Sequence, residues 1–137
     1  MMRMNLKIGG VTIKEAAVKV LDERDRDTIA ALQAIGVRRN VAAIIVYLKD
    51  LDEVATRDIE KGSGLRQPEV SIAMRLLRDK SWIAECEVKG GGKGRPTRLY
   101  RLTVSIDDII GYYEKEKRSE SSRAMQSIQK LKEITAT

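Results

Sequence analysis

The sequence predicts a mainly α-helical protein with a small β-hairpin, and three observations lead to this fold class. Apolar residues recur every three or four positions in several segments, as in amphipathic helices. Apolar and polar residues nearly alternate in two later stretches, "SWIAECEV" and "TRLYRLTV", as in strands. A glycine tract within "KGGGKG" separates these stretches, so we expect a two-stranded hairpin with a long tip.

Helical patterns cover most of the N-terminal part of the chain. Thr12 and Glu15 in "TIKE" have the spacing of a capping box, which predicts a first helix over about residues 12–22. A second pattern, in "TIAALQAIG", ends at Gly36. Its inward face carries Ile29, Leu32 and Ile35. The pattern leaves open whether the two segments form one bent helix or two.

Two helices are expected in the middle of the chain, before the hairpin-forming stretches. "VRRNVAAIIVYLKDLDE" predicts a buried helix over about residues 38–50, with inward-facing Val41, Ile44, Ile45 and Leu48. "ATRDIEKGSG" predicts a shorter helix that ends in glycines. Its inward residues are Ala55 and Ile59, and the glycines are Gly62 and Gly64.

Two further helices flank the hairpin. Pro68 suits the first residue of a helix, because proline lacks the N–H that a first-turn residue leaves unpaired. The stripe of this helix is Val70, Ala73, Met74 and Leu77. After the hairpin, Ser105 and Asp108 form another capping pair that predicts a helix over about residues 105–132.

Composition narrows the possible functions. The chain has 137 residues, a net charge of +6, no histidine and a single cysteine. Without these usual ligands and bases we expect no metal site, no cofactor and no enzyme activity. Cys86 is expected to be a small buried apolar residue.

The longest apolar run, "VAAIIVYL", is too short to span a bilayer, and no secretion signal is evident, so we expect a cytoplasmic protein. The net charge of +6 favours a polyanionic partner.

The segment "GLRQPEVSIAMRLLRDKSWI" (Gly64–Ile83) resembles the recognition segment of prokaryotic winged-helix transcription regulators of the ArsR, MarR and TrmB-like kinds. The matching residues are Leu65, Gln67, Val70, Ser71, Met74, Leu77, Arg78, Asp79 and Ile83. "GRPTRLYRLT" (Gly94–Thr103) is similar to the wing tip and returning strand of the same families. The resemblance covers about residues 37–104 and implies a winged helix-turn-helix that binds double-stranded DNA.

We therefore expect one domain over residues 1–137, built in three parts. Residues 1–36 form an N-terminal helical extension, 37–104 the winged helix-turn-helix, and 105–137 a C-terminal helix for dimerisation. The sequence departs from the family pattern at Ser81, where glycine is usual, and at Trp82, where a smaller aliphatic residue is common. With these two residues, the corner between the recognition helix and the hairpin could differ in shape from that of the family. The metal ligands of ArsR-like sensors are absent, so metal sensing is not implied.

If the apolar stripe of the recognition helix points inward, its opposite face is left for DNA. An α-helix fits the major groove, where base edges give sequence choice, while phosphate contacts position the protein. Gln67 is expected to pair with an adenine edge, Arg75 with guanine or phosphate, and Ile72 with a thymine methyl. The basic wing is expected to follow the backbone or the minor groove. The predicted DNA-binding residues are Arg66, Gln67, Pro68, Ser71, Ile72, Arg75, Arg78, Lys89, Lys93, Arg95 and Arg98.

These residues also have ordinary interpretations. The helix residues could be the solvated face of any amphipathic helix, and Ile72 could pack under a neighbouring helix. The glycine tract could be an incidental solvated loop. A phosphate-binding loop is disfavoured, because that motif ends in Gly-Lys-Ser/Thr before a helix, whereas "GGGKGRPT" leads into a strand.

A dimer through both terminal regions is expected, because a palindromic site needs two recognition helices related by a two-fold axis, and the C-terminal helix offers the candidate contacts. The partner-facing candidates are Ile109, Ile110, Tyr113, Ala124, Ile128 and Leu131. Packing against the N-terminal helices is the alternative. The polar middle, "EKEKRSESSR", argues against an uninterrupted coiled coil.

The sequence thus predicts a cytoplasmic homodimer that binds double-stranded DNA sequence-specifically and regulates transcription, with repression as the default assignment. Two alternatives remain. One is a winged helix that docks proteins within the transcription machinery. The other is RNA binding, which the small number of aromatic residues disfavours. No feature of the sequence identifies a small-molecule effector.

Overall fold

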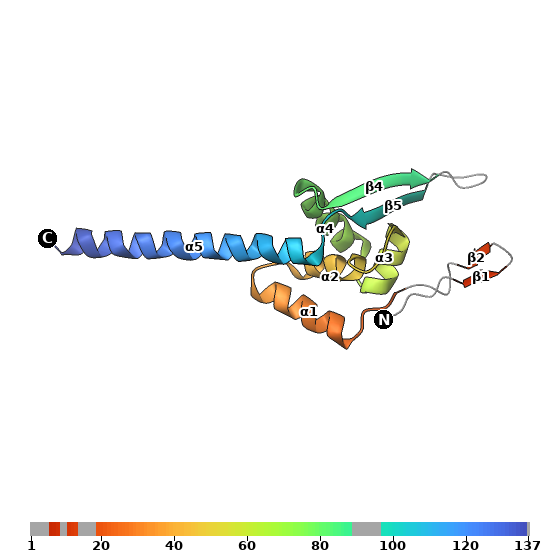
Figure 1. Cartoon of the computed structure of the whole chain (residues 1–137), viewed down its shortest axis with the longest axis horizontal. Helices are drawn as coiled ribbons and strands as arrows, with labels where there is room; N and C mark the ends of the chain where they lie inside the picture. Colours follow the sequence, from red (N-terminus) through yellow and green to blue (C-terminus); the bar gives the residue numbers. More distant parts are fainter. Residues whose placement is uncertain (1–5, 9–10, 14–18, 89–96, 137) are drawn as a thin grey trace. The chain divides into compact units, whose positions relative to one another are not determined.

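The computed structural model describes the backbone of residues 6–8 and 11–13, and residues 19–88 and 97–136 in full. The chain divides into two compact units, residues 1–104 and residues 105–137. In chain order the elements are β1 (Leu6–Ile8), β2 (Val11–Ile13), α1 (Glu23–Ala34), α2 (Arg39–Leu48), β3 (Val54–Ala55), α3 (Thr56–Ser63), α4 (Gln67–Asp79), β4 (Ile83–Val88), β5 (Thr97–Leu102) and α5 (Ile106–Thr135) (Figure 1). The order from α2 to β5 is that of a winged helix-turn-helix, so the predicted fold class is confirmed.

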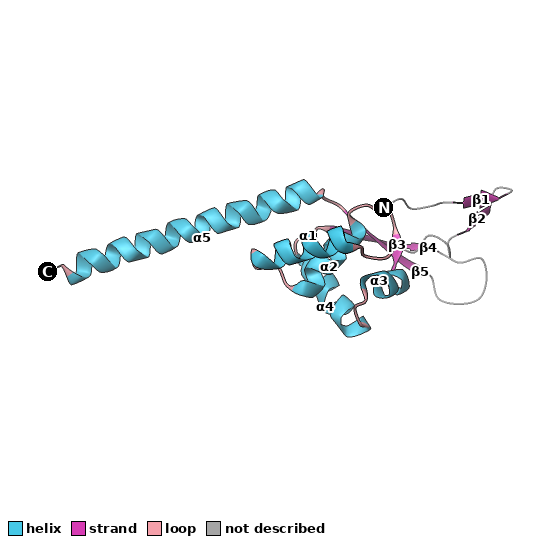
Figure 2. Cartoon of the chain, turned by 90° about the horizontal axis from the view of Figure 1, so that it is seen from below, coloured by secondary structure: helices cyan, strands magenta, loops and turns pink. Residues whose placement is uncertain are grey.

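Helix α2 is the centre of the first unit. Every residue from Val41 to Leu48 is buried, and α2 contacts α1, α3 and α4 (Figure 2). A helix that is apolar on all sides is stable only inside a core. The side-chain amide of Asn40 donates to the Glu69 carbonyl at 3.1 Å, which ties the start of α2 to the first turn of α4. Helix α4 is therefore held in place through the core of this unit.

Helix α4 buries the stripe that the sequence predicts. Val70, Ala73, Met74 and Leu77 are each at most 4% exposed. The helix begins one residue before Pro68, so the proline lies in the first turn, where it removes no helical hydrogen bond. At the preceding helix, Ile59 is buried and Gly64 ends α3 with a left-handed φ of 75°. The tight turn between α3 and α4 therefore uses the glycine that the sequence places there.

The predicted hairpin is confirmed, and it belongs to a larger sheet. Strands β4 and β5 pair antiparallel, with Ile83 opposite Leu102 and Glu85 opposite Tyr100. Strand β3 adds to the other side of β5, giving the order β3-β5-β4. The sequence prediction of a two-stranded hairpin missed β3, because two residues are too few to show alternation.

Ser81 and Trp82, the two departures from the family pattern, lie at the corner between α4 and β4. Ser81 has a φ of 61°, in the left-handed region that favours glycine. The Thr103 hydroxyl donates to the Ser81 carbonyl, and the Thr103 N–H donates to the Trp82 carbonyl, both at 2.8 Å. Trp82 is buried. These contacts hold a conformation that serine adopts at some cost.

The first predicted helix, over residues 12–22, is wrong. Val11–Ile13 form strand β2, paired antiparallel with β1, and residues 19–22 are not helical. Glu15 lies outside the described residues. "VTI" is rich in β-branched residues, which favours a strand. The capping box lies further along the chain: the Asp25 N–H donates to the Asp22 carboxylate at 2.8 Å, and the Asp25 side chain accepts in return.

Two buried groups join the segment before α1 to the end of α2. The Lys19 ammonium donates to the Val46 carbonyl at 3.1 Å and lies 3.6 Å from the Asp50 carboxylate. Tyr47 is 1% exposed. Burial, with a smaller contribution from the Asp58 charge, raises the pKa of Tyr47 to about 12. The core around α2 thus keeps this phenol protonated.

The second unit is the long helix α5, and its predicted extent over about residues 105–132 is confirmed. Ser105 accepts from the Asp108 N–H at 3.0 Å, so the predicted capping pair is present. Ion pairs within the helix, such as Arg118 with Glu114 at 2.9 Å, stabilise its polar middle.

Cys86 corrects another expectation, because its thiol is exposed rather than buried. It lies on β4 at the edge of the sheet, and its Sγ donates to the Glu53 carboxylate at 3.0 Å. That hydrogen bond is the main cause that raises the pKa of the Cys86 thiol. A raised pKa keeps the group a thiol rather than a reactive thiolate.

Candidate functional site

The face of α4 opposite its buried stripe is exposed. Ile72 is 45% exposed, so it does not pack under a neighbouring helix. All the predicted DNA-binding residues on α4 and at its start are exposed. They are Arg66, Gln67, Pro68, Ser71, Ile72, Arg75 and Arg78. One side of α4 therefore presents polar and cationic groups together with an exposed aliphatic side chain.

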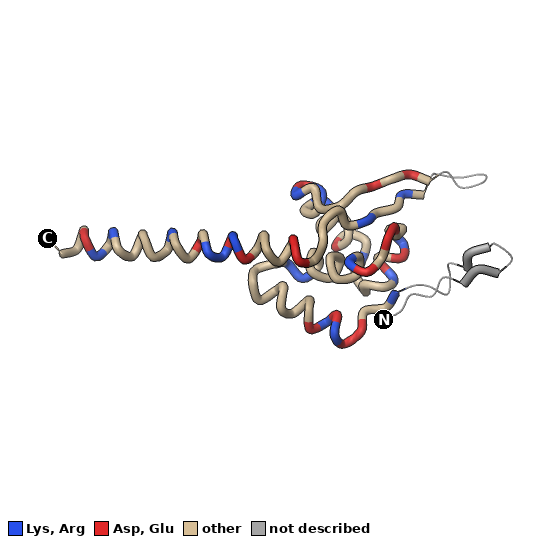
Figure 3. Tube along the Cα trace, viewed as in Figure 1, with Lys and Arg blue, Asp and Glu red and all other residues tan. Residues whose placement is uncertain are grey.

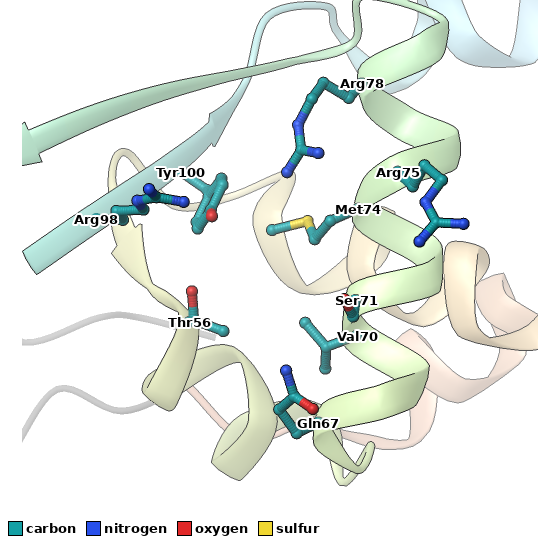
Figure 4. A pocket seen from close by; sticks show the side chains of 9 residues that line it. All are labelled: Thr56, Gln67, Val70, Ser71, Met74, Arg75, Arg78, Arg98 and Tyr100. Carbon is teal, nitrogen blue, oxygen red and sulfur yellow. The ribbon is translucent and has the colours of Figure 1, made fainter.

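A depression of about 360 Å³ lies between α4, the start of α3 and strand β5 (Figure 4). It brings together five of the predicted residues from separate parts of the sequence: Gln67, Ser71, Arg75, Arg78 and Arg98. The remaining lining residues are Thr56, Val70, Met74 and Tyr100. Figure 4 shows Arg78 directed from α4 toward β5, whereas the guanidinium of Arg75 is directed away from Arg98. Helix α4 and strand β5 thus share one cationic depression.

Sequence reasoning missed two polar residues that line this depression, Thr56 and Tyr100. Thr56 is the first residue of α3, which the sequence assigned only to a short helix. Tyr100 is buried, and it faces Val54 of β3 and Glu85 of β4 across the sheet. Its place beside α4 follows only from the tertiary fold, so "TRLYRL" alone does not indicate it.

Two arginines of the depression, Arg78 and Arg98, pair with acidic residues of β4. The Glu85 carboxylate lies 3.8 Å from Nη2 of Arg78 and 3.6 Å from Nε of Arg98. Glu87 lies 3.7 Å from Nε of Arg98. Figure 3 shows acidic residues along β4 and basic residues along the neighbouring strand β5. The arginine side chains stay about half exposed, at 54% for Arg78 and 59% for Arg98. Exposed ion pairs of this kind contribute little to stability, so the guanidinium groups remain available to another anion.

The remaining predicted wing residues, Lys89, Lys93 and Arg95, lie outside the described residues. Their placement beside α4 stays a prediction.

In the part of the chain that the structure describes, no three acidic or cysteine side chains gather to hold a metal ion. No helix in that part combines the length and apolar character needed to cross a membrane.

Helix α5 carries the predicted partner-facing residues, and they differ in exposure. Ile110, Ile128 and Leu131 are 47%, 45% and 60% exposed, and Ala124 is also exposed. Tyr113 is half-buried. Ile109 is fully buried within the chain and therefore has no surface to offer a partner. Met125, which the sequence prediction omitted, is 61% exposed next to Ala124.

Comparisons with known proteins give a structural match but no sequence match. No family model and no curated protein matches the chain. Among solved structures, a possible transcriptional regulator from Methanosarcina mazei Go1 has a TM-score of 0.57 at 14% identity, with coverage of 94% of this chain and 98% of that one. The circadian clock associated protein Pex from anabaena has a TM-score of 0.42 at 16% identity, with coverage of 74% and 99%. The first similarity shows that the chain shares the fold of that regulator-like protein.

Proposed function

We propose that the protein binds double-stranded DNA in a sequence-specific manner as a cytoplasmic homodimer and regulates transcription. Repression, by covering a promoter, is the simplest mode of action. The observation that carries the proposal is the shared depression, where the exposed face of α4 meets Arg98 of the wing strand. The Methanosarcina mazei protein, named as a possible transcriptional regulator, has the same fold.

The chemistry of the exposed face of α4 fits a duplex. Gln67 can make a bidentate contact to adenine, and Arg75 can do the same to guanine. Ile72 offers an apolar contact for a thymine methyl, which would account for an aliphatic side chain that is 45% exposed. Arg66, with a side chain that is 89% exposed, and Arg78 lie near the two ends of the helix and are assigned to phosphates.

RNA is a weaker candidate than DNA. Single-stranded RNA is bound largely by stacking bases on aromatic rings. The aromatic residues within 19–88 and 97–104 are Tyr47, Trp82 and Tyr100, and all three are buried, so none of them offers an open ring face.

The test is duplex binding as a function of salt. If a dimer neutralises about 6–10 phosphates, affinity should fall by about 10³–10⁵ between 50 and 200 mM salt. Fluorescence anisotropy with a labelled random duplex measures this slope, and structured RNA serves as competitor. A salt-independent affinity, or no binding at low salt with retention of one stable protein partner, would favour the protein-docking alternative.

We assign the dimer contact to α5. Ala124, Ile128 and Leu131 follow a four- and three-residue spacing, and Ile110 lies two heptads before Ala124, so these apolar groups lie on one side of the helix. The substitution Ile128→Asp should shift the protein to monomer in sedimentation velocity, because a charge in an apolar helix contact is costly. Gln126→Asp, which places the same charge on the opposite side of the helix, is the matched control and should leave the dimer intact. Equal behaviour of the two variants would reject this assignment.

A further inference from the structure

Glu85 is a partner that the recognition helix and the wing strand share. Its Oε1 lies 3.8 Å from Nη2 of Arg78, and its Oε2 lies 3.6 Å from Nε of Arg98. The strand register explains why Arg98 can contact Glu85. Glu87 is directly opposite Arg98, and Glu85 is the diagonal neighbour of Arg98 on the same face of the sheet. Each oxygen of one carboxylate therefore faces a different arginine, one from α4 and one from β5.

The same two arginines line the depression of Figure 4, together with the side chains of Thr56, Ser71 and Tyr100. A phosphate group offers several oxygen acceptors, and guanidinium and hydroxyl groups are donors that suit them. The described residues that line the depression include three arginines and no acidic residue. The depression thus has the donors and the charge for an oxyanion, and Glu85 approaches the arginines as a competing anion.

We propose that Arg78 and Arg98 form a site for one phosphate group, and that Glu85 competes with this phosphate for both arginines. The proposal rests on the proposed DNA binding for the source of the phosphate, which is then the backbone of one strand. Free inorganic phosphate has the same chemistry and is tested separately. By weakening every backbone contact at this site, Glu85 increases the relative weight of the base contacts made by α4. It is therefore a specificity-determining residue.

The geometry of the ion pairs supports displacement. Separations of 3.6 and 3.8 Å exceed the length of a hydrogen bond, which is about 2.7–3.2 Å for N–H···O. Both arginines are more than half exposed, so water screens these pairs. A phosphate can instead take short, charge-assisted and bidentate hydrogen bonds from arginine. The phosphate is thus the stronger of the two partners.

The experiment compares Glu85→Gln with Glu87→Gln. Both substitutions remove one negative charge from the same strand, but Glu87 contacts Arg98 alone of the two arginines, at 3.7 Å. At 100 mM salt, Glu85→Gln should raise affinity for a random duplex about fivefold, the effect of removing a like charge near a phosphate, and Glu87→Gln by less than about twofold. Glu85→Gln should also reduce the preference for a selected duplex over the random one.

Equal gains for the two variants would overturn the proposal, since the effect would then be one of net charge. A loss of affinity in Glu85→Gln would also overturn it, because Glu85 would then hold the arginines in place rather than compete. Unchanged thermal unfolding of both variants verifies that the fold is intact.

A second readout separates this proposal from the proposed function. Inorganic phosphate is titrated into each variant while NMR follows the Nε–Hε signals of Arg78 and Arg98. Glu85→Gln should respond at lower phosphate concentration than Glu87→Gln. If duplex binding is absent but this difference is found, the oxyanion site stands and DNA binding fails. If the arginine signals respond alike in both variants, or do not respond, the site is rejected.

Discussion

Helices α4 and α5 both carry apolar stripes, but the chain buries only one of them. In α4, Val70 and Leu77 are at most 1% exposed, and the surface left over is polar and cationic. In α5, Ile128 and Leu131 are 45% and 60% exposed, and the surface left over includes apolar side chains. A polyanion suits the polar and cationic surface of α4. Another apolar surface suits the exposed apolar side chains of α5. The contrast indicates two different partners, which we propose to be DNA and a second copy of the chain.

The largest expected effect comes from the same substitution placed in each helix. Leu77→Ala should lower the free energy of unfolding by about 2–5 kcal/mol, because it opens a cavity in the core. Leu131→Ala should change it by less than about 0.5 kcal/mol in dilute protein, because the side chain is already exposed in the single chain. Urea denaturation measures both. Similar losses for the two variants would contradict the contrast between the helices.

The next effect is a change of stability with pH, and it compares a tyrosine in the unit that contains α4 with a tyrosine in α5. The pKa of Tyr47 in α2 is raised to about 12, whereas the unfolded chain loses this proton near about pH 10. Between these values the folded state binds more protons than the unfolded state, so stability falls as pH rises, by as much as about 2–3 kcal/mol. Tyr47→Phe should remove this part of the loss, and Tyr112→Phe in α5 should leave it in place. Urea midpoints measured across this alkaline range test the prediction. The same dependence of the midpoint on pH in both variants would exclude the buried phenol as the cause.

The smallest expected effects distinguish base contacts from phosphate contacts. Gln67→Ala and Arg75→Ala should weaken binding to a selected duplex by about 1–3 kcal/mol and blur its preference over random DNA. Lys93→Ala and Arg95→Ala should weaken binding to all sequences alike and lower the salt slope by about one each. Competition between the two duplexes measures the difference. Equal losses on both duplexes for all four variants would refute this division between α4 and the wing.

Sequence patterns predicted the parts of the fold whose side chains repeat regularly. Leu77 and the other stripe residues of α4 were evident from spacing alone, as were the start of α5 and the hairpin. Strand β3 was not, because two residues show no period. The exposure of Cys86 depends on β4 being an edge strand, which the sequence does not encode locally. The pairing of Glu85 with two arginines requires a strand register and a helix position that only tertiary packing supplies.

The central claim is that the exposed face of α4 reads duplex DNA, and selection of bound duplexes from a random pool tests it most directly. We predict enrichment of one motif as two inverted half-sites, with centres separated by about one helical turn, 10–10.5 base pairs, or a multiple of it. The same selection with Arg75→Ala should give a weaker motif. A recovered pool with the composition of the input, at a salt concentration where the protein remains folded, would contradict the claim.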